Sequence, residues 1–105
     1  MPADRLETLK AMLAQDPSNS FARYGLAMEY VHSGKLEAAV DEFRTLIAAN
    51  PDYPAAYYHS GRTLEKLGRT EEARTMMEQG IEVTTRLGDT HTRSELQAAL
   101  DLLEV

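Results

Sequence analysis

Three histidines are the residues of this chain best suited to bind a metal ion or to transfer a proton. They are His32, His59 and His91. Helical zinc motifs place three to five residues between two histidines, and no two of these histidines are that close. A metal site would need one ligand from each of three separate segments. Exposed or hydrogen-bonded histidines are the simpler interpretation, and we expect neither a metal ion nor another cofactor.

Carboxylates and nucleophiles offer no clearer catalytic arrangement. Asp41-Glu42 and Glu71-Glu72 are adjacent pairs, so on a helix their side chains diverge instead of sharing a proton. The chain has no cysteine, which excludes a thiolate nucleophile, a thiolate metal site and a disulfide framework. No serine or threonine has a histidine and an aspartate as nearby partners in sequence, although a triad assembled in the tertiary structure stays open. The six glycines are scattered, so no phosphate-binding loop is present, and we expect no enzymatic activity.

The composition is that of a single soluble domain with an acidic balance. The chain has 105 residues, of which 43% are hydrophobic and 27% charged. Its net charge of −6 disfavours binding to nucleic acid, which depends on lysine and arginine. No apolar run approaches the roughly 20 residues that span a bilayer, and no basic-then-apolar leader follows Met1. These features predict a cytoplasmic protein without a membrane anchor.

The elements that must position these side chains are helices. Leu6, Leu9 and Leu13 recur at helical intervals, and no segment alternates with the period of a strand. Glycine, proline and capping residues separate the periodic segments. The expected helices span residues 3–15, 19–33, 36–49, 53–67, 70–87 and 91–104. Their short connections predict an all-α fold of about six helices paired as antiparallel hairpins.

A repeat of thirty-four residues organises the middle of the chain between Ser20 and Leu87. A fixed period in this range is typical of helical repeat arrays, in which each unit buries its apolar face only against its neighbours. Six pairs of residues thirty-four apart are identical: Ala22 and Ala56, Tyr24 and Tyr58, Gly34 and Gly68, Glu37 and Glu71, Ala39 and Ala73, and Ile47 and Ile81. Two further pairs are similar in size without being identical, Ala27 with Gly61 and Phe43 with Met77.

The spaced residue types in these units resemble the tetratricopeptide repeat. The first unit matches the family pattern at Leu26, Ala27, Tyr30, Gly34, Leu36, Ala39, Phe43, Ile47 and Pro51. The second matches at Tyr57, Gly61, Leu64, Gly68, Ala73 and Ile81. The resemblance implies helix hairpins stacked as a short right-handed superhelix. It divides the chain into an N-terminal half repeat (3–17), two repeats (20–53 and 54–87) and a C-terminal capping helix (89–105).

The second unit departs from the family pattern at two positions. Ser60 stands where a large aliphatic residue is expected, and Thr85 stands where proline is expected. Without that proline the helix is predicted to continue to about Leu87, where Gly88 ends it. The pattern Thr92-x-x-Glu95 predicts a capping box for the last helix.

The resemblance also implies a binding surface, because first helices of successive units line a concave face that receives a peptide or helix of another protein. The residues expected on that face are Tyr24, Met28 and Val31 in the first unit and Tyr58, Arg62 and Glu65 in the second. In the simplest alternative the two tyrosines and Met28 belong partly to the core, and Arg62 pairs with Glu65 on the surface. The first interpretation predicts an adaptor or scaffold whose partner is another protein.

Two further expectations concern partners. Some family members hold the C-terminal carboxylate of heat-shock chaperones with lysine, asparagine and arginine; here the corresponding positions carry Tyr24, Met28 and His59, so that clamp is missing. The second expectation is an alternative function, a homodimer in which Phe21, Tyr24, Met28 and Val31 pair with a second copy of the chain.

Overall fold

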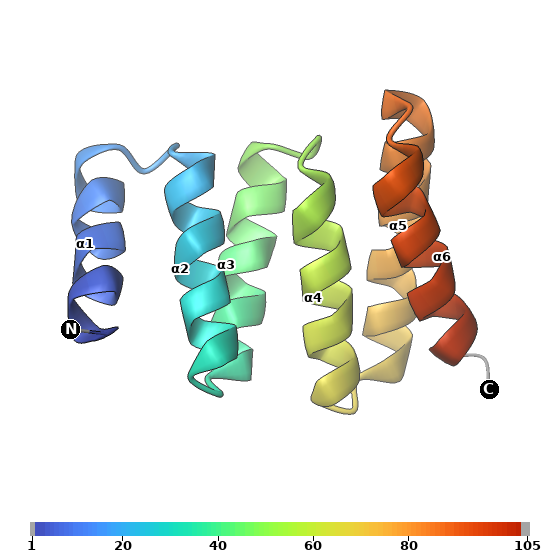
Figure 1. Cartoon of the computed structure of the whole chain (residues 1–105), viewed down its shortest axis with the longest axis horizontal. Helices are drawn as coiled ribbons and strands as arrows, with labels where there is room; N and C mark the ends of the chain where they lie inside the picture. The colour runs from blue at the N-terminus through green and yellow to red at the C-terminus, as the bar shows by residue number, and fades with distance from the viewer. Residues whose placement is uncertain (1, 104–105) are drawn as a thin grey trace.

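A computed structural model describes residues 2–103, with side chains from residue 5 onward, and every regular element in that range is a helix (Figure 1). The helices are α1 (Pro2–Gln15), α2 (Ser20–His32), α3 (Leu36–Ala49), α4 (Pro54–Lys66), α5 (Thr70–Leu87) and α6 (Thr90–Leu103). The predicted all-α fold is confirmed, and the predicted helix ends agree with these bounds to within one residue. Residues 104 and 105, which were included in the predicted capping segment, lie outside the described residues.

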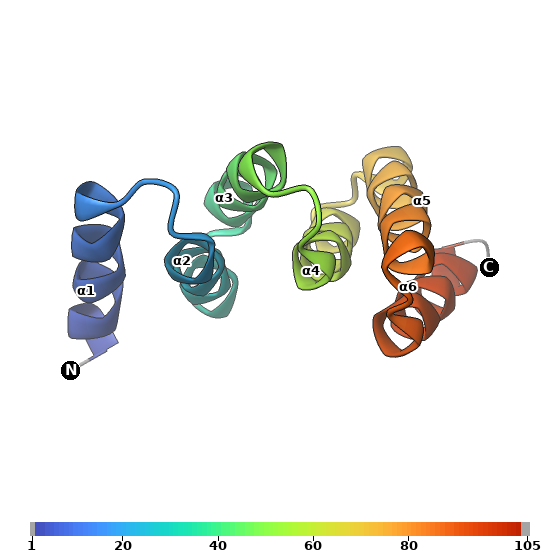
Figure 2. The same cartoon turned by 90° about the horizontal axis from the view of Figure 1, so that it is seen from above.

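The helices form two layers, because each short connection turns the chain back on itself. Seen from above, α2, α4 and α6 lie on one side of the molecule and α3 and α5 on the other (Figure 2). Each helix packs on the next one in sequence, and α4 also packs on α6. The result is an elongated body with principal extents of 39 × 28 × 20 Å. Residues thirty-four apart therefore occupy equivalent places on α2 and α4.

The core consists of three adjoining clusters along the stack. Leu9 and Leu13 of α1 pack on Ala22 and Leu26 of α2. A second cluster joins α2, α3 and the start of α4 around Phe43. The third joins α3, α4, α5 and α6, with these buried members: Val40, Tyr57, Leu64, Ala73, Met76, Met77, Leu96 and Ala99. Each cluster lies between neighbouring helices, as expected for a repeat array.

Local chemistry explains where helices begin and end. The Asn19 side chain caps α2 by accepting a hydrogen bond from the Ala22 backbone N–H at 3.0 Å. Gly88 adopts a φ of 74° and ends α5 directly after Leu87, so the predicted long helix is confirmed.

The predicted capping box of α6 is wrong. The Asp89 carboxylate accepts the hydrogen bond of the Thr92 backbone N–H at 3.0 Å, while Thr92 itself lies inside the helix. This bond lowers the pKa of Asp89. Glu95 instead lies 3.6 Å from His91, one turn earlier on the same helix. An aspartate three residues before the backbone donor is itself a strong capping signal, and Asp89, not Thr92, is the N-cap residue of α6.

Candidate functional site

The first row of predicted site residues lies along α2, beside that helix's buried face. Tyr24, Met28 and Val31 are half-buried and pack against the cluster around Phe43. The centroid of the Tyr24 ring lies 6.3 Å from that of Phe43. These side chains thus contribute to the core and are also partly open to solvent. One turn before Tyr24 on the same row, Phe21 is 72% exposed.

The second row lies along α4, where the three predicted residues contact one another. The Arg62 guanidinium donates hydrogen bonds to the Glu65 carboxylate and to the Tyr58 hydroxyl, each at 3.1 Å. It also lies 5.9 Å from the centroid of the Tyr58 ring. The surface pairing of Arg62 with Glu65, considered above as the simpler alternative, is therefore present. Because the pair is half-exposed, its contribution to stability is small.

An aromatic cluster links the two rows, and His59 lies at its centre. The His59 ring meets the rings of Tyr24 and Tyr58 edge to face, with centroid distances of 5.9 and 5.1 Å. Tyr53, the residue before α4, lies 5.5 Å from Tyr24. We call Tyr24, Tyr53, Tyr58 and His59 the ring cluster. Edge-to-face contacts of this kind add to the stabilisation that burial alone provides.

Two members of the ring cluster, Tyr53 and His59, were not among the predicted binding residues. In the sequence, His59 stands out only as a possible metal ligand and as the residue at one position of the missing clamp. The sequence signal for His59 was the run Tyr57-Tyr58-His59. Side chains at three consecutive positions of a helix point in different directions around its axis, so these three rings cannot all face the core. With Tyr57 buried in the core, the other two rings fall on the neighbouring surface.

Burial favours the uncharged form of three members of the ring cluster, His59, Tyr24 and Tyr53. Burial is the main cause that lowers the pKa of His59; Glu95 opposes it, and the charges of Arg62 and His32 reinforce it. Burial likewise raises the pKa of Tyr24 and of Tyr53. Each of these three shifts favours the uncharged form of the ring. The surface suits apolar and aromatic contacts better than ionic ones.

The charges of the chain are divided unequally between the two layers. In α2, α4 and α6, four cationic and four anionic side chains cancel. In α3 and α5, seven carboxylates face only three cations, which leaves a charge of −4. The acidic balance of the sequence therefore lies mainly on the layer opposite the ring cluster.

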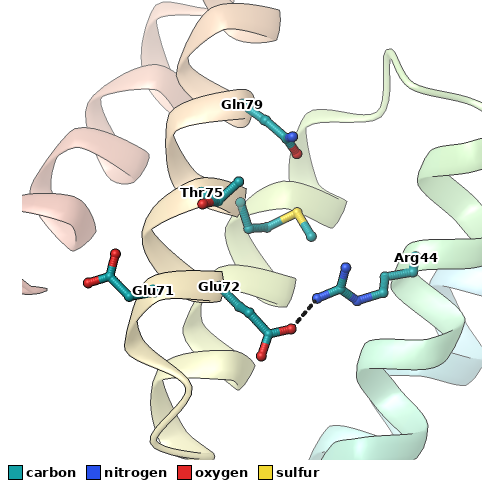
Figure 3. A pocket seen from close by; sticks show the side chains of 6 residues that line it. Arg44, Glu71, Glu72, Thr75 and Gln79 are labelled. Atoms are coloured by element: carbon teal, nitrogen blue, oxygen red, sulfur yellow. Dashed lines mark hydrogen bonds and ion pairs between the residues drawn. The ribbon is translucent and has the colours of Figure 1, made fainter.

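Two hollows on the surface lie away from both rows. One, of about 270 Å³, lies between α3 and α5 and is lined by Arg44, Glu71, Glu72, Thr75, Met76 and Gln79 (Figure 3). In it, Arg44 and Glu72 point toward one another and form an ion pair at 3.0 Å. Another, of about 440 Å³, adjoins the α2–α3 turn and Leu67. Neither contains any of the six predicted site residues.

Two absences concern the part of the chain that the structure describes. Among the described residues, no three histidine or carboxylate side chains come together in a way that could hold a metal ion. No helix between residues 2 and 103 is both long and apolar enough to cross a bilayer.

Comparison with known proteins identifies similar chains. The sequence model of the tetratricopeptide repeat matches residues 24–79. A TPR repeat-containing protein of Pseudomonas aeruginosa is 28% identical over 99 residues, which cover 94% of each chain. The solution structure of a tetratricopeptide repeat domain protein from Salinibacter ruber is 39% identical and has a TM-score of 0.79. The match covers 85% of this chain and 90% of that one.

A more distant likeness concerns the fold alone. PcrH, whose crystal structure is a complex with the chaperone-binding region of PopD, matches with a TM-score of 0.91 at 14% identity. The match covers 98% of this chain and 78% of PcrH. The stack of six helices is thus an arrangement that very different sequences adopt.

Proposed function

The chain belongs to the tetratricopeptide repeat family, and from that premise we propose that it is an adaptor whose α2, α4 and α6 layer binds a peptide or helix of another protein. Members of this family are typically protein-interaction modules without enzymatic activity. The finer proposal, which concerns the surface and the form of the ligand, is supported by the geometry of the two rows.

The ring cluster is the observation that carries this proposal. Tyrosine and arginine are enriched among residues that dominate binding energy. Here Tyr24 of α2 lies close to Tyr53, the residue before α4, and Tyr58 bonds to Arg62 on α4. Ring contacts at 5.1 to 5.9 Å and the bond from Arg62 to the Tyr58 hydroxyl hold the side chains in place before any ligand arrives. Little conformational entropy would then be lost on binding.

The fold neighbours support a protein ligand in general terms. PcrH, which contains a helical stack of the same shape, forms a complex with the chaperone-binding region of PopD. Because its identity to this chain is 14%, the likeness extends to the architecture and not to the contacting residues. It supports the idea that such a stack offers enough surface for another protein.

An affinity-capture experiment with matched variants tests the proposal. Wild-type protein, the double variant Tyr58→Ala, Arg62→Glu and a control, Thr75→Ala, Gln79→Ala, would be used as baits in lysate of the native host. The control changes the hollow on the opposite layer, and circular dichroism would verify the folding of all three. We expect a partner that the control retains and the double variant loses, with affinity lowered at least about tenfold. A partner that all three baits retain equally would contradict the proposed surface.

Self-association is a second candidate function, favoured by the 72% exposure of Phe21 on the row of α2. An exposed phenylalanine on a half-buried apolar row could pair with the same row of a second copy. Sedimentation velocity over a wide concentration range tests this candidate. A dimer that Phe21→Ala dissociates would support it, and a monomer at all concentrations would exclude it.

A further inference from the structure

α1 is attached to the rest of the protein by one face. Within the described residues it packs on α2, whereas α3 packs on both α2 and α4, and α5 on both α4 and α6. The buried side chains of α1 are Leu9 and Leu13, and Leu6 is half-buried. α4, a helix of 13 residues, buries six. A helix with so few buried contacts is expected to be among the first to leave when a protein opens locally.

The equivalent helix of the first repeat, α3, has a buried face that α1 lacks. The interval of thirty-four residues places Arg5 at the position of Ala39 and Met12 at the position of Leu46. Ala39 and Leu46 are buried in the cluster around Phe43, at 0% and 1% exposure. Arg5 is exposed, and Met12 is 37% exposed. α1 therefore lacks the apolar contacts by which α3 is held to its hairpin partner.

The polar link between α1 and α2 is weak as well. Among the described side chains it is one ion pair, in which the Arg5 Nε lies 2.6 Å from the Glu29 carboxylate and the Arg5 side chain is 64% exposed. Pairs so exposed contribute little to stability. The connection to α2 has anchors of its own, since Asn19 caps α2 and the Arg23 guanidinium donates to the Pro17 carbonyl at 3.1 Å. α1 can therefore leave while the start of α2 stays in place.

Departure of α1 would uncover an apolar strip of α2. Ala22 and Leu26 are buried in the cluster that Leu9 and Leu13 complete. Leu9 also lies over Gly25, where an added Cβ would be 3.1 Å from the Leu9 Cδ2. A helix of fourteen residues is marginal in water on its own, so α1 should unfold once it leaves. Burial of the strip favours its return.

We propose that α1 is a detachable strap, which unfolds from α2 in a local opening step while α2–α6 stay folded, and which thereby uncovers Ala22, Gly25 and Leu26. This inference goes beyond the proposed function and holds with or without a bound partner. It predicts two separate opening steps in one small domain, a frequent one at α1 and a rare one in which the whole chain unfolds.

Amide hydrogen exchange of the full chain, followed by NMR in urea concentrations below the unfolding transition, tests the strap. After correction for intrinsic rates, amides of residues 8–15 should exchange at least about thirtyfold faster than the slowest amides of α4 and α5. Their rates should rise less than about twofold per molar urea, because little surface is exposed, against about fivefold or more in α4 and α5. The same rates and the same urea dependence in α1 and α5 would overturn the inference.

Matched variants show which amides share an opening step. Ile81→Val trims a partly buried side chain against the α4–α6 core, so it should speed exchange in α4 and α5 about threefold and leave α1 unchanged. Leu13→Ala should speed exchange throughout α1 more than about tenfold, with α4 and α5 still protected.

Two results of these variants would overturn the inference. Acceleration of α1 by Ile81→Val to the same factor as α5 would show that α1 unfolds only with the whole protein. Loss of all protection in α4 and α5 of the Leu13→Ala protein would show that α2–α6 cannot stay folded without α1. Neither result would affect the proposed function, because affinity capture with the variants of Tyr58 and Arg62 reports on a different face.

Discussion

At the scale of single residues, His59 is a base that its surroundings keep neutral. Burial between two aromatic rings disfavours the imidazolium, and the charges of Arg62 and His32 act in the same direction. The carboxylate of Glu95 on α6 opposes them but does not reverse the shift. The pKa of His59 is consequently lower in the folded protein than the ordinary value of 6.5.

This shift predicts a pH dependence of stability. Between the lowered pKa of His59 and 6.5, the unfolded chain binds more protons at this residue than the folded one. The free energy of unfolding should therefore fall as the pH drops below about 6.5. Urea denaturation at about pH 7.5 and about pH 5.5 would measure the loss, and His59→Gln should reduce it. His91→Gln, at a position whose side chain is 85% exposed, should leave it unchanged; an identical loss in all three proteins would contradict the assignment to His59.

Ser60, at which the chain departs from its family pattern, lowers the stability of the folded protein. Its side chain is fully buried, and within the described residues its hydroxyl has no hydrogen-bond partner. Ser60→Ala removes the unsatisfied group and also favours the helix, so unfolding should become harder by about 1 kcal/mol. The urea midpoint would show the gain. Thr63→Val is the control, since the Thr63 hydroxyl is satisfied by the His59 carbonyl at 2.6 Å and its removal should bring no gain.

At the scale of helices, the contact of α5 with α4 and α6 depends on a glycine inside α5. A Cβ added to Gly80 would lie 2.7 Å from the Tyr57 Cβ and 2.9 Å from a methyl carbon of Leu96. The first of these atoms moves only with the backbone of α4. The three helices therefore meet at this point because one of them lacks a side chain there.

Replacing that glycine should destabilise the protein although alanine is the better helix former. We expect Gly80→Ala to lower the free energy of unfolding by about 1 to 2 kcal/mol, because overpacking outweighs the gain of up to about 1 kcal/mol in helix propensity. Chemical denaturation would measure the difference. In the matched variant Gly25→Ala, the added Cβ would lie 3.1 Å from a terminal methyl of Leu9, which can rotate away, so stability should stay equal or rise. A Gly80→Ala protein as stable as wild type would show that the helices can separate without cost.

The helices themselves could be predicted closely from sequence, and their contacts less so. Their ends follow from local signals such as Pro54 and Gly88, which act wherever the helix packs. The capping residue of α6 was misassigned because two capping signals overlap, and only the structure shows that Asp89 provides the cap. Gly80 could not be singled out, since inside a helix it looks like a weak helix former until Leu96 of α6 is placed against it.

At the scale of the whole molecule, the thirty-four-residue period predicts the two rows of side chains on α2 and α4 but not the ring cluster that links them. The interval of thirty-four residues put Tyr24 and Tyr58 at equivalent positions on α2 and α4. The ring cluster depends in addition on how far apart those helices stand and on Tyr53, which lies in a connection outside the helical pattern. The period also gave no sign that the acidic charge gathers on α3 and α5, because charges are free to vary at solvent-facing positions.

The distribution of charge and the side chains of the rows together predict that this protein does not bind acidic chaperone tails. Tyr24, Met28 and His59 replace the residues with which some family members hold a terminal carboxylate, and the net charge of −6 repels an acidic peptide. Fluorescence anisotropy with a labelled ten-residue peptide rich in aspartate and glutamate, with a free C-terminus, should give a Kd weaker than about 100 μM. The same peptide with an amidated C-terminus should behave alike, because Arg62, the cation of the two rows, is already paired with Glu65. Sub-micromolar binding that requires the free carboxylate would mean that cations elsewhere on the chain form a clamp, and the surface assigned to α2 and α4 would then be the wrong one.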